Sequence, residues 1–353
     1  MGPIRVPSCR LRLLSLLGAL LLLALPACER PPRPPSPGEV VVYTSVDEVF
    51  ARPIADEFER ETGVRVRLVP DTEETKSTGL LNRLIAERQR PVADVFWSGD
   101  PVRAAILKRQ GVSAEYRSPR ASGLPERFSD PEGHWTGFSA RARVLIVNTD
   151  LVPADQRPRS VMDLLDERFR NRACIANPLF GTTSMHAAAM FQVLGPERAE
   201  AFFEGFVANG GRILSSNGEV RRRVAAGEFA VGITDTDDVN VARIEGKPVA
   251  AVYPDADGVG TLIIPNCAVL IANGPNPENA RRFIDYLLAP ESERRLAESE
   301  AAQMPVRGGV AAPDHVTHLD DLTPMEVDYG RLAPLLEELS AGYLKQWVER
   351  SLP

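Results

Sequence analysis

Three aspartates follow an apolar segment in the later part of the chain. Asp235, Asp237 and Asp238 come shortly after the run at residues 230–233, which has the composition of a buried strand. Carboxylates this close repel one another by about 1–4 kcal/mol per pair at a few ångströms, depending on the dielectric. A cation would relieve that repulsion, so the segment is a candidate cation site. The structural alternative is capping of a helix start, and Asp238 is the first candidate for a cap.

A second acidic pair follows an apolar segment much earlier in the chain. Asp47 and Glu48 come after the run at residues 40–43. Carboxylate and hydroxyl oxygens are hard donors, which suit Mg²⁺, Ca²⁺, Mn²⁺ or a trivalent hard ion better than a soft metal. An organic cation such as an amine would suit the same carboxylates, with Trp97 and Tyr43 as possible cation–π faces. Both ligand classes stay open.

A hydroxyl-rich segment could receive negative charge instead. Gly181, Thr182, Thr183 and Ser184 precede a helical pattern, and the N–H groups at a helix start favour an anion or a ligand carboxylate. Capping of the helix by Thr183 or Ser184 explains the same residues equally well.

These residues are set on a chain that alternates between short β-rich runs and amphipathic helical patterns. The expected strands are at residues 40–43, 64–69, 93–97, 144–147, 173–176, 230–233, 262–264 and 269–271. The expected helices include residues 50–58, 80–85, 104–107, 161–165, 185–194, 196–208, 220–226, 280–288 and a terminal helix at 331–352. This alternation predicts an α/β fold with a mostly parallel sheet covered by helices on both faces.

The N-terminal segment has the features of a secretory signal. A basic start at Arg5, Arg10 and Arg12 leads into an apolar run that is too short for a membrane-spanning helix of about 20 residues. The run ends in Leu-Pro-Ala-Cys at Cys28, which resembles the bacterial lipobox. The resemblance implies a lipoprotein signal peptide at residues 1–27 and diacylation of Cys28.

A proline-rich stretch comes next. Residues 28–38 contain five prolines and predict a stiff, extended tether. The mature chain would then be periplasmic or at the cell surface of a bacterium, held to a membrane through its lipid anchor only. The alternative is an ordinary cleaved signal with an incidental cysteine.

Charge and length limit the classes of partner. The formal charge of −7 becomes −10 when the three arginines of residues 1–27 are removed. An acidic chain does not suit a phosphate backbone, so we expect no nucleic-acid partner. The remaining length is enough for two domains of about 100–200 residues each.

Several short motifs, in their order along the chain, together carry a family resemblance. They lie at residues 41–45, 93–98, 137–144, 181–184, 215–218, 227–228 and 232–238. The chain from about residue 40 to residue 307 resembles periplasmic solute-binding proteins of bacterial ABC importers, in the branch that includes the ferric-binding proteins.

The resemblance implies a two-lobed periplasmic-binding-protein fold of type II, with hinged α/β lobes of mixed, mostly parallel sheets. Lobe 1 would comprise residues 39–138 and 267–353, and lobe 2 residues 139–266. The ligand would bind in the cleft, where strand ends meet helix starts. The implied partners are an ABC permease and ATPase, and we expect a monomer.

The iron ligands of that branch are not present at the matching positions. The pair of tyrosines that binds the metal falls on Thr236 and Asp237, the histidine on Asp47 and the glutamate near Thr78. Carboxylates from both lobes could still surround a cation, with Asp47, Asp235 and Asp237 as its ligands. Of Arg141 and Arg143, at the expected lobe crossing, we expect one to face the cleft and the other to be solvated.

We therefore expect a lipid-anchored binding protein that captures a cationic solute, with ferric iron or another hard metal ion as the first candidate. The alternative ligand is a small organic solute, such as an amine, an aminoalkyl phosphonate or a polar lipid-derived molecule. The expected ligand residues are Asp47, Glu48, Thr78, Trp97, Ser98, Arg141, Thr182, Thr183, Ser184, Asp235, Thr236, Asp237 and Asp238. No resident cofactor is expected.

Two other classes of function are open on sequence grounds. A surface hydrolase could use Ser184 or Cys174 with His186, but no nucleophile-elbow motif surrounds Ser184, so we expect no enzyme. A tethered sensor or adaptor could keep the same fold and contact another protein.

Overall fold

The computed structural model describes residues 2, 38–71 and 78–352. Apart from residue 2, the signal peptide expected at residues 1–27, the lipidated Cys28 and the tether up to residue 37 lie outside the described residues. Within the described part of the chain, no helix combines the length and the apolar composition needed to cross a bilayer.

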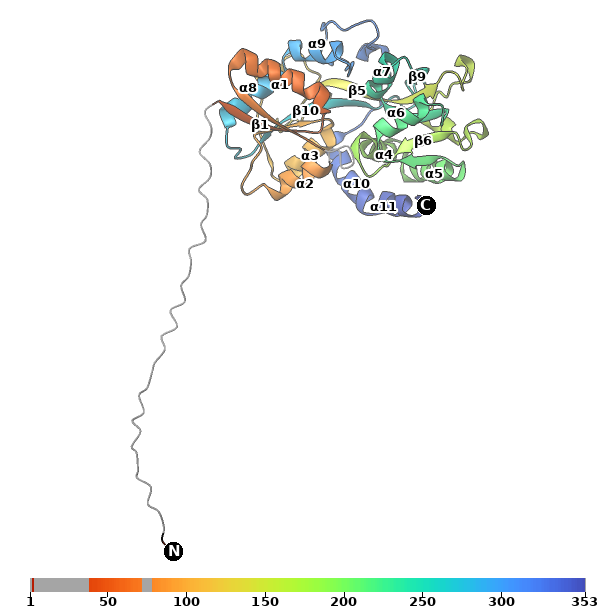
Figure 1. Ribbon diagram of the computed structural model, residues 1–353, viewed down its shortest axis with the longest axis horizontal. Helices are drawn as coiled ribbons and strands as arrows, with labels where there is room; N and C mark the ends of the chain where they lie inside the picture. Colours follow the sequence, from red (N-terminus) through yellow and green to blue (C-terminus); the bar gives the residue numbers. More distant parts are fainter. Residues whose placement is uncertain (1, 3–37, 72–77, 353) are drawn as a thin grey trace. The chain divides into compact units, whose positions relative to one another are not determined.

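The chain from residue 38 onward forms a mixed sheet between layers of helices (Figure 1). What we call the first half contains strands β1 (Glu39–Thr44), β2 (Arg65–Pro70), β3 (Val95–Ser98) and β4 (Ser113–Ala114). Its helices are α1 (Glu48–Thr62), α2 (Thr78–Ala86), α3 (Pro101–Arg109), α8 (Pro277–Leu287) and α9 (Pro290–Glu298).

The second half has the same kind of construction. Its strands are β6 (Ala173–Ala176), β7 (Arg212–Leu214), β8 (Val231–Asp235) and β9 (Val249–Val252). Its helices are α4 (Gly181–Leu194), α5 (Pro196–Ala208), α6 (Asn217–Ala225) and α7 (Thr236–Ile244). Residues 161–165, expected to be a short helix, form a 3₁₀ helix.

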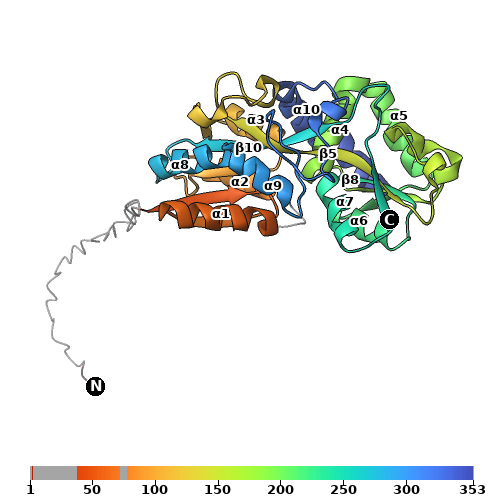
Figure 2. The same ribbon diagram turned by 90° about the horizontal axis from the view of Figure 1, so that it is seen from above.

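Two long strands connect the halves, β5 (Thr136–Asn148) and β10 (Ile263–Ile271). They pair with each other, β10 also pairs with β3, and β5 continues into pairing with β8 (Figure 2). The strand order is β2-β1-β3-β10-β5-β8-β6-β7. Pairing is parallel within each half, but β5 and β10 run antiparallel to their neighbours. The sheet is therefore mixed, as expected, but it is not mostly parallel, because every pairing that β5 and β10 make is antiparallel.

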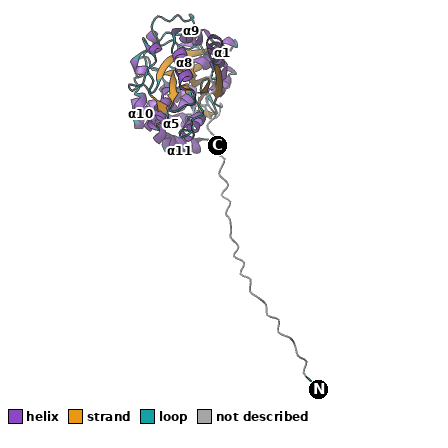
Figure 3. Cartoon of the chain, turned by 90° about the vertical axis from the view of Figure 1, so that its left-hand side faces the viewer, coloured by secondary structure: helices purple, strands orange, loops and turns teal. Residues whose placement is uncertain are grey.

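Side chains alternate between the two faces of the sheet because successive strand residues point in opposite directions. In β1, Val40 and Val42 pack with α1 and α8, whereas Val41 and Tyr43 join the cluster that includes α2 and α3. All four are buried, so the strand is apolar throughout rather than alternating. Helices cover the sheet on both sides, and in the end-on view of Figure 3 the strands lie among the surrounding helices.

The C-terminal segment differs from its expected form. The single helix expected at residues 331–352 is divided into α10 (Tyr329–Ala341) and α11 (Tyr343–Ser351), because Gly342 leaves the helical conformation. Helix α10 contacts both α3 and α4. Helix α11 packs on α5, where the Trp347 and Phe203 rings lie 5.0 Å apart. Helix α10 therefore lies against both halves, and α11, expected to belong with the first half, packs on the second.

Candidate functional site

A cavity of about 70 Å³ lies where helix starts from both halves meet the connecting strand β5. Among the expected ligand residues, those that line it are Asp47, Arg141, Thr182, Thr183, Asp235, Asp237 and Asp238. Further lining residues, which the sequence analysis missed, include Ser45, Phe50, Asn177, Phe180, Ser215, Ser216, Asn217, Gly218 and Gln303. At roughly 10–15 Å³ for each water-sized group, this volume has room for about five to seven such groups.

The first half contributes the turn between β1 and α1. Thr44 Oγ1 accepts a hydrogen bond from Val46 N at 3.1 Å and donates to the Trp97 carbonyl oxygen at 3.0 Å. Ser45 Oγ accepts from Gly99 N at 2.8 Å. These bonds join the ends of two neighbouring parallel strands, so the turn that carries Asp47 is held against β3.

The second half contributes three helix starts. Ser216 caps α6, because its Oγ accepts from Glu219 N at 3.1 Å. Helices α4 and α7 begin after Phe180 and Asp235 without a side-chain cap. The capping roles considered for Thr183, Ser184 and Asp238 are therefore not found. Asp238 Oδ2 instead accepts from Thr234 Oγ1 at 2.5 Å.

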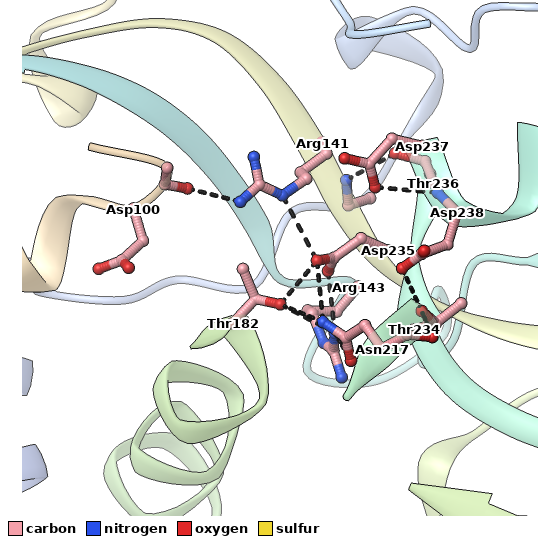
Figure 4. Close-up of polar contacts among 12 residues, drawn as sticks. Asp100, Arg141, Arg143, Thr182, Asn217, Thr234, Asp235, Thr236, Asp237 and Asp238 are labelled. Atoms are coloured by element: carbon pink, nitrogen blue, oxygen red, sulfur yellow. Dashed lines mark hydrogen bonds and ion pairs between the residues drawn. The ribbon is translucent and has the colours of Figure 1, made fainter. Parts of the chain in front are cut away.

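Asp235 lies at the centre of a buried network (Figure 4). Its Oδ1 accepts from Arg143 Nη1 at 2.9 Å, and its Oδ2 accepts from Thr182 Oγ1 at 2.6 Å. Arg141 Nε lies 3.4 Å from the same Oδ2. Burial would raise the pKa of Asp235, but Arg143, Arg141 and the Thr182 hydrogen bond outweigh it, and the pKa is lowered.

Arg141 and Arg143 both face this network, which corrects the expectation that one would be solvated. They are two residues apart on β5, so they point to the same face of the sheet. Arg143 is fully buried and also donates to Thr182 Oγ1 at 3.1 Å and to Asn217 Oδ1 at 3.2 Å. It belongs to the wall behind the cavity, while Arg141 lines the cavity itself.

The guanidinium of Arg141 contacts protein groups through two of its three nitrogens. Its Nη2 donates to the Gly99 carbonyl oxygen at 2.8 Å, and Nε faces Asp235. Among the described residues, none forms a hydrogen bond with Nη1 (Figure 4). Burial would lower the pKa of Arg141, but Asp237, Asp235 and Asp47 raise it, so the group stays charged.

The three aspartates do cluster as the sequence suggested. One carboxylate oxygen from each of Asp235, Asp237 and Asp238 lies within 4.8 Å of the others. Burial, together with the neighbouring carboxylates, raises the pKa of Asp237 to about 7 despite the opposing effect of Arg141. Asp235 is paired with two arginines, and the carboxylates of Asp47, Asp237 and Asp238 line the same cavity.

Several expected ligand residues do not line the cavity. Trp97 is fully buried and packs on Phe138, and Tyr43 is fully buried with Arg83 over its ring at 4.6 Å. Neither ring faces the cavity, because both belong to strands whose two faces are covered by helices. The aromatic side chains at the cavity are those of Phe50 and Phe180.

The remaining expected ligand residues have other contacts. Glu48 is exposed and pairs with Arg52 at 2.8 Å, and Ser98 Oγ donates to the Asp100 carbonyl oxygen at 2.6 Å. Thr236 Oγ1 accepts from Ala142 N at 3.2 Å. Thr78 begins α2 and is not among the lining residues.

Ser184 and His186 do not form a nucleophile–base pair. Ser184 Oγ donates to the Gly181 carbonyl oxygen at 2.7 Å and accepts from Arg103 Nη2 at 2.7 Å. Burial and Arg143 lower the pKa of His186 to about 3. Cys174 is buried, and burial raises the pKa of its thiol. These environments disfavour nucleophilic catalysis.

A family model and the sequences of known proteins both match this chain. The family described as "Bacterial extracellular solute-binding protein" matches residues 90–327. "Iron uptake protein A1" of Synechocystis sp. is 26% identical, covering 83% of this chain and 81% of that protein. The "Putative 2-aminoethylphosphonate-binding periplasmic protein" of Salmonella typhimurium is 29% identical, covering 73% of this chain and 74% of that protein.

Solved structures share the fold. Iron-bound HitA from Pseudomonas aeruginosa superposes with a TM-score of 0.79 at 22% identity, covering 88% of this chain and 99% of that chain. AfuA from Actinobacillus pleuropneumoniae with fructose-6-phosphate bound superposes with a TM-score of 0.78 at 23% identity. The match covers 89% of this chain and 98% of that chain. The expected type II periplasmic-binding-protein fold is confirmed. Since these two proteins hold different ligands, the fold alone does not determine the ligand.

Proposed function

Because the chain belongs to the bacterial extracellular solute-binding protein family, we propose that it is the solute-binding component of an ABC importer, anchored to a bacterial membrane through Cys28. It works as a monomer with a permease and an ATPase. Two lobes, residues 39–138 with 267–298 and residues 139–266 with helix α11, are hinged about β5 and β10. The cavity between the two halves receives the solute.

The ligand that the geometry supports best is a small organic solute with a positively charged group and an anionic group. Asp47, Asp237 and Asp238 offer carboxylates to the positive group. Arg141 offers Nη1, and the starts of α4 and α6 offer hydroxyls and N–H groups, to the anionic group. This division of charge within one cavity is the observation that carries the proposal.

Size and similarity both support this ligand class. Room for about five to seven water-sized groups suits a small solute, whereas a bare ion would leave most of the cavity to water. The Salmonella relative is named for 2-aminoethylphosphonate, a compound with an amine at one end and a phosphonate at the other. We therefore use 2-aminoethylphosphonate as the first probe.

A ferric ion or another hard cation is the second candidate. The clustered carboxylates and the relative named as an iron uptake protein favour it. The engagement of Asp235 by Arg141 and Arg143 weighs against it, since a metal would have to compete with two guanidinium groups for that carboxylate. Threonine and aspartate in place of the tyrosine pair also weigh against Fe³⁺.

Thermal-shift screening followed by calorimetry separates the candidates, because only a ligand of the native state stabilises it by mass action. The probes are 2-aminoethylphosphonate, ethanolamine, inorganic phosphate and ferric citrate. We expect 2-aminoethylphosphonate to raise the melting temperature more than ethanolamine or phosphate does. Stabilisation by ferric citrate alone would establish the second candidate, and stabilisation by phosphate alone would contradict a site for the positive group.

A further inference from the structure

A buried arginine connects the two halves beside the cavity. Arg103 on α3 donates from Nη2 to Ser184 Oγ on α4 at 2.7 Å, across 81 positions of sequence. Arg103 is 2% exposed and Ser184 is fully buried. Neither residue lines the cavity. Their contact is therefore between protein groups and is sheltered from solvent.

Each end of this contact is attached to a wall of the cavity. Ser184 Oγ also donates to the Gly181 carbonyl oxygen at 2.7 Å, so it closes the first turn of α4 around Thr182 and Thr183. At the other end, Asp100 Oδ1 accepts from Arg103 N at 3.0 Å and caps α3. The preceding residue, Gly99, accepts from Arg141.

The side chain of Arg103 is anchored mainly through these contacts. Its Nη1 lies 3.6 Å from Asp100 Oδ2, and neither Nη1 nor Nε has a hydrogen-bond partner among the described residues. A buried guanidinium with unfilled donors is costly, and each contact that it does make offsets part of that cost. Within the described ranges, the guanidinium of Arg103 makes one short hydrogen bond, which is the bond to Ser184.

We propose that Arg103 is a positioning residue that fixes the first turn of α4 relative to α3 and Arg141. While this contact is formed, the N–H groups of α4 and the Arg141 guanidinium are held at a fixed separation, ready for the same anionic group. The effect on ligand affinity rests on the proposed function, whereas the effect on α4 does not.

Hydrogen exchange measured by mass spectrometry tests the ligand-independent part. We expect Arg103→Met and Ser184→Ala each to raise the exchange rate of the Ser184 and Met185 amides at least tenfold. The double variant should exchange no faster than Ser184→Ala, because Ser184→Ala already removes the bond to Arg103 together with the bond to the Gly181 carbonyl oxygen. Lys108→Met on the same helix is the control, since Lys108 pairs with Asp130 within the first half at 2.7 Å.

Other outcomes overturn the proposal. If Arg103→Met raises exchange throughout α3 but leaves α4 unchanged, Arg103 only stabilises its own helix. If Ser184→Ala leaves α4 unchanged, the hydrogen bond does not hold that turn. Ser184→Ala is the milder variant and keeps the test valid if Arg103→Met fails to fold.

Calorimetry with two probes tests the consequence for binding. We expect Ser184→Ala to lower the affinity for 2-aminoethylphosphonate at least threefold. The affinity for ethanolamine should change by less than twofold, because only the phosphonate group would contact α4 and Arg141. Equal weakening of both probes would contradict the positioning role. If neither probe binds the unmodified protein, the proposed ligand class fails, while the exchange result still decides whether Arg103 holds α4.

Discussion

Asp235 and Asp237 lie two residues apart, yet their carboxyl groups have opposite electrostatic environments. Arg143 and Arg141 hold the pKa of Asp235 below its ordinary value, whereas burial and neighbouring carboxylates raise that of Asp237 to about 7. Asp235 is thus a charged partner of the arginines, and Asp237 is the group whose charge a ligand can change. Predictions for single residues follow from this difference.

Asp237→Ala should weaken binding of 2-aminoethylphosphonate at least tenfold, or about 1.4 kcal/mol. The reason is loss of a carboxylate that lines the cavity and has no arginine within ion-pairing distance among the described residues. Isothermal calorimetry measures the change. Glu48→Ala is the matched control, because Glu48 is exposed and pairs with Arg52 away from the cavity. Equal affinity of the Asp237 variant and the unmodified protein would remove Asp237 from the site.

The affinity for an amine should rise with pH as Asp237 loses its proton. With the pKa of Asp237 at about 7, the carboxylate is mostly neutral at about pH 6 and mostly charged at about pH 8. We expect binding of ethanolamine to strengthen across this range. In Asp237→Asn the dependence should flatten, and a profile that keeps its slope would assign the titration to another group.

Rising pH, which should strengthen amine binding through Asp237, should lower the stability of the unliganded protein through the same group. The pKa of Asp237 is higher in the folded protein than the ~3.9 of an unfolded chain, so between these values the folded state holds more protons. The free energy of unfolding contributed by this group therefore falls as pH rises through that window. Urea denaturation at several pH values measures this change. The free energy of unfolding should fall less with rising pH in Asp237→Asn than in the unmodified protein.

At the scale of elements, β5 brings together parts that are distant in sequence. Arg143 on this strand reaches α4 through Thr182 and Thr183, α6 through Asn217, and the end of β8 through Asp235. The contacts with Thr182, Thr183 and Asp235 are buried, and buried polar contacts are costly when one partner is lost. The starts of three helices thus depend on one guanidinium.

Arg143→Met should lower the free energy of unfolding by about 3–5 kcal/mol, because it leaves Asp235 buried with one cationic partner fewer. Chemical denaturation measures the difference. The control is Arg52→Met, which removes an exposed pair with Glu48 and should cost only about 0–1 kcal/mol. Similar losses in the two variants would show that the Arg143 network contributes little.

Local patterns predicted the elements better than they predicted their contacts. The apolar runs at residues 40–43 and 230–233 became β1 and β8, because strands covered on both faces are apolar throughout. The same coverage buried Trp97 and Tyr43, which the sequence offered as ligand faces. The pattern of residues 331–352 did not reveal the break at Gly342.

The candidate site was predictable where strand ends carry acidic or hydroxyl residues. Asp47, Asp237 and Thr182 were expected at the cavity and do line it. The pairing of Asp235 with Arg143 could not be found from spacing, because the two residues are 92 positions apart. Asn217 was missed as well, although Ser216 before it is a typical helix cap.

At the scale of the molecule from residue 38 onward, the chain crosses between the halves more than twice. Strands β5 and β10 make two crossings, and the segment after α9 makes another. That segment pairs Met304 with Ala140 and Pro324 with Thr261, close to Gly260. Gly260 has φ +83°, and a Cβ there would lie 2.6 Å from the Thr323 carbonyl oxygen, so the approach requires glycine.

Helix α11, which follows this crossing, packs on the second half. Trp347 is fully buried on α11 and meets Phe203 of α5 edge to face. Trp347→Ala should lower the free energy of unfolding by about 3–5 kcal/mol. Because the lost contacts belong to the second half, the accompanying rise in hydrogen exchange should appear in α5 and leave α8 unchanged.

Phe283→Ala in α8 is the matched comparison. Phe283 is fully buried in the first half and meets Phe58 edge to face, with ring centroids 5.0 Å apart, the same separation as for Trp347 and Phe203. Its loss should raise exchange in α1 and α8 and leave α5 unchanged.

A Trp347 variant that raises hydrogen exchange in α8 and α9 instead would place residues 343–352 with the first lobe, as the sequence had suggested. The expected result would make α11 part of the second lobe, so that any hinge motion must also be accommodated by the segment that leads into α10.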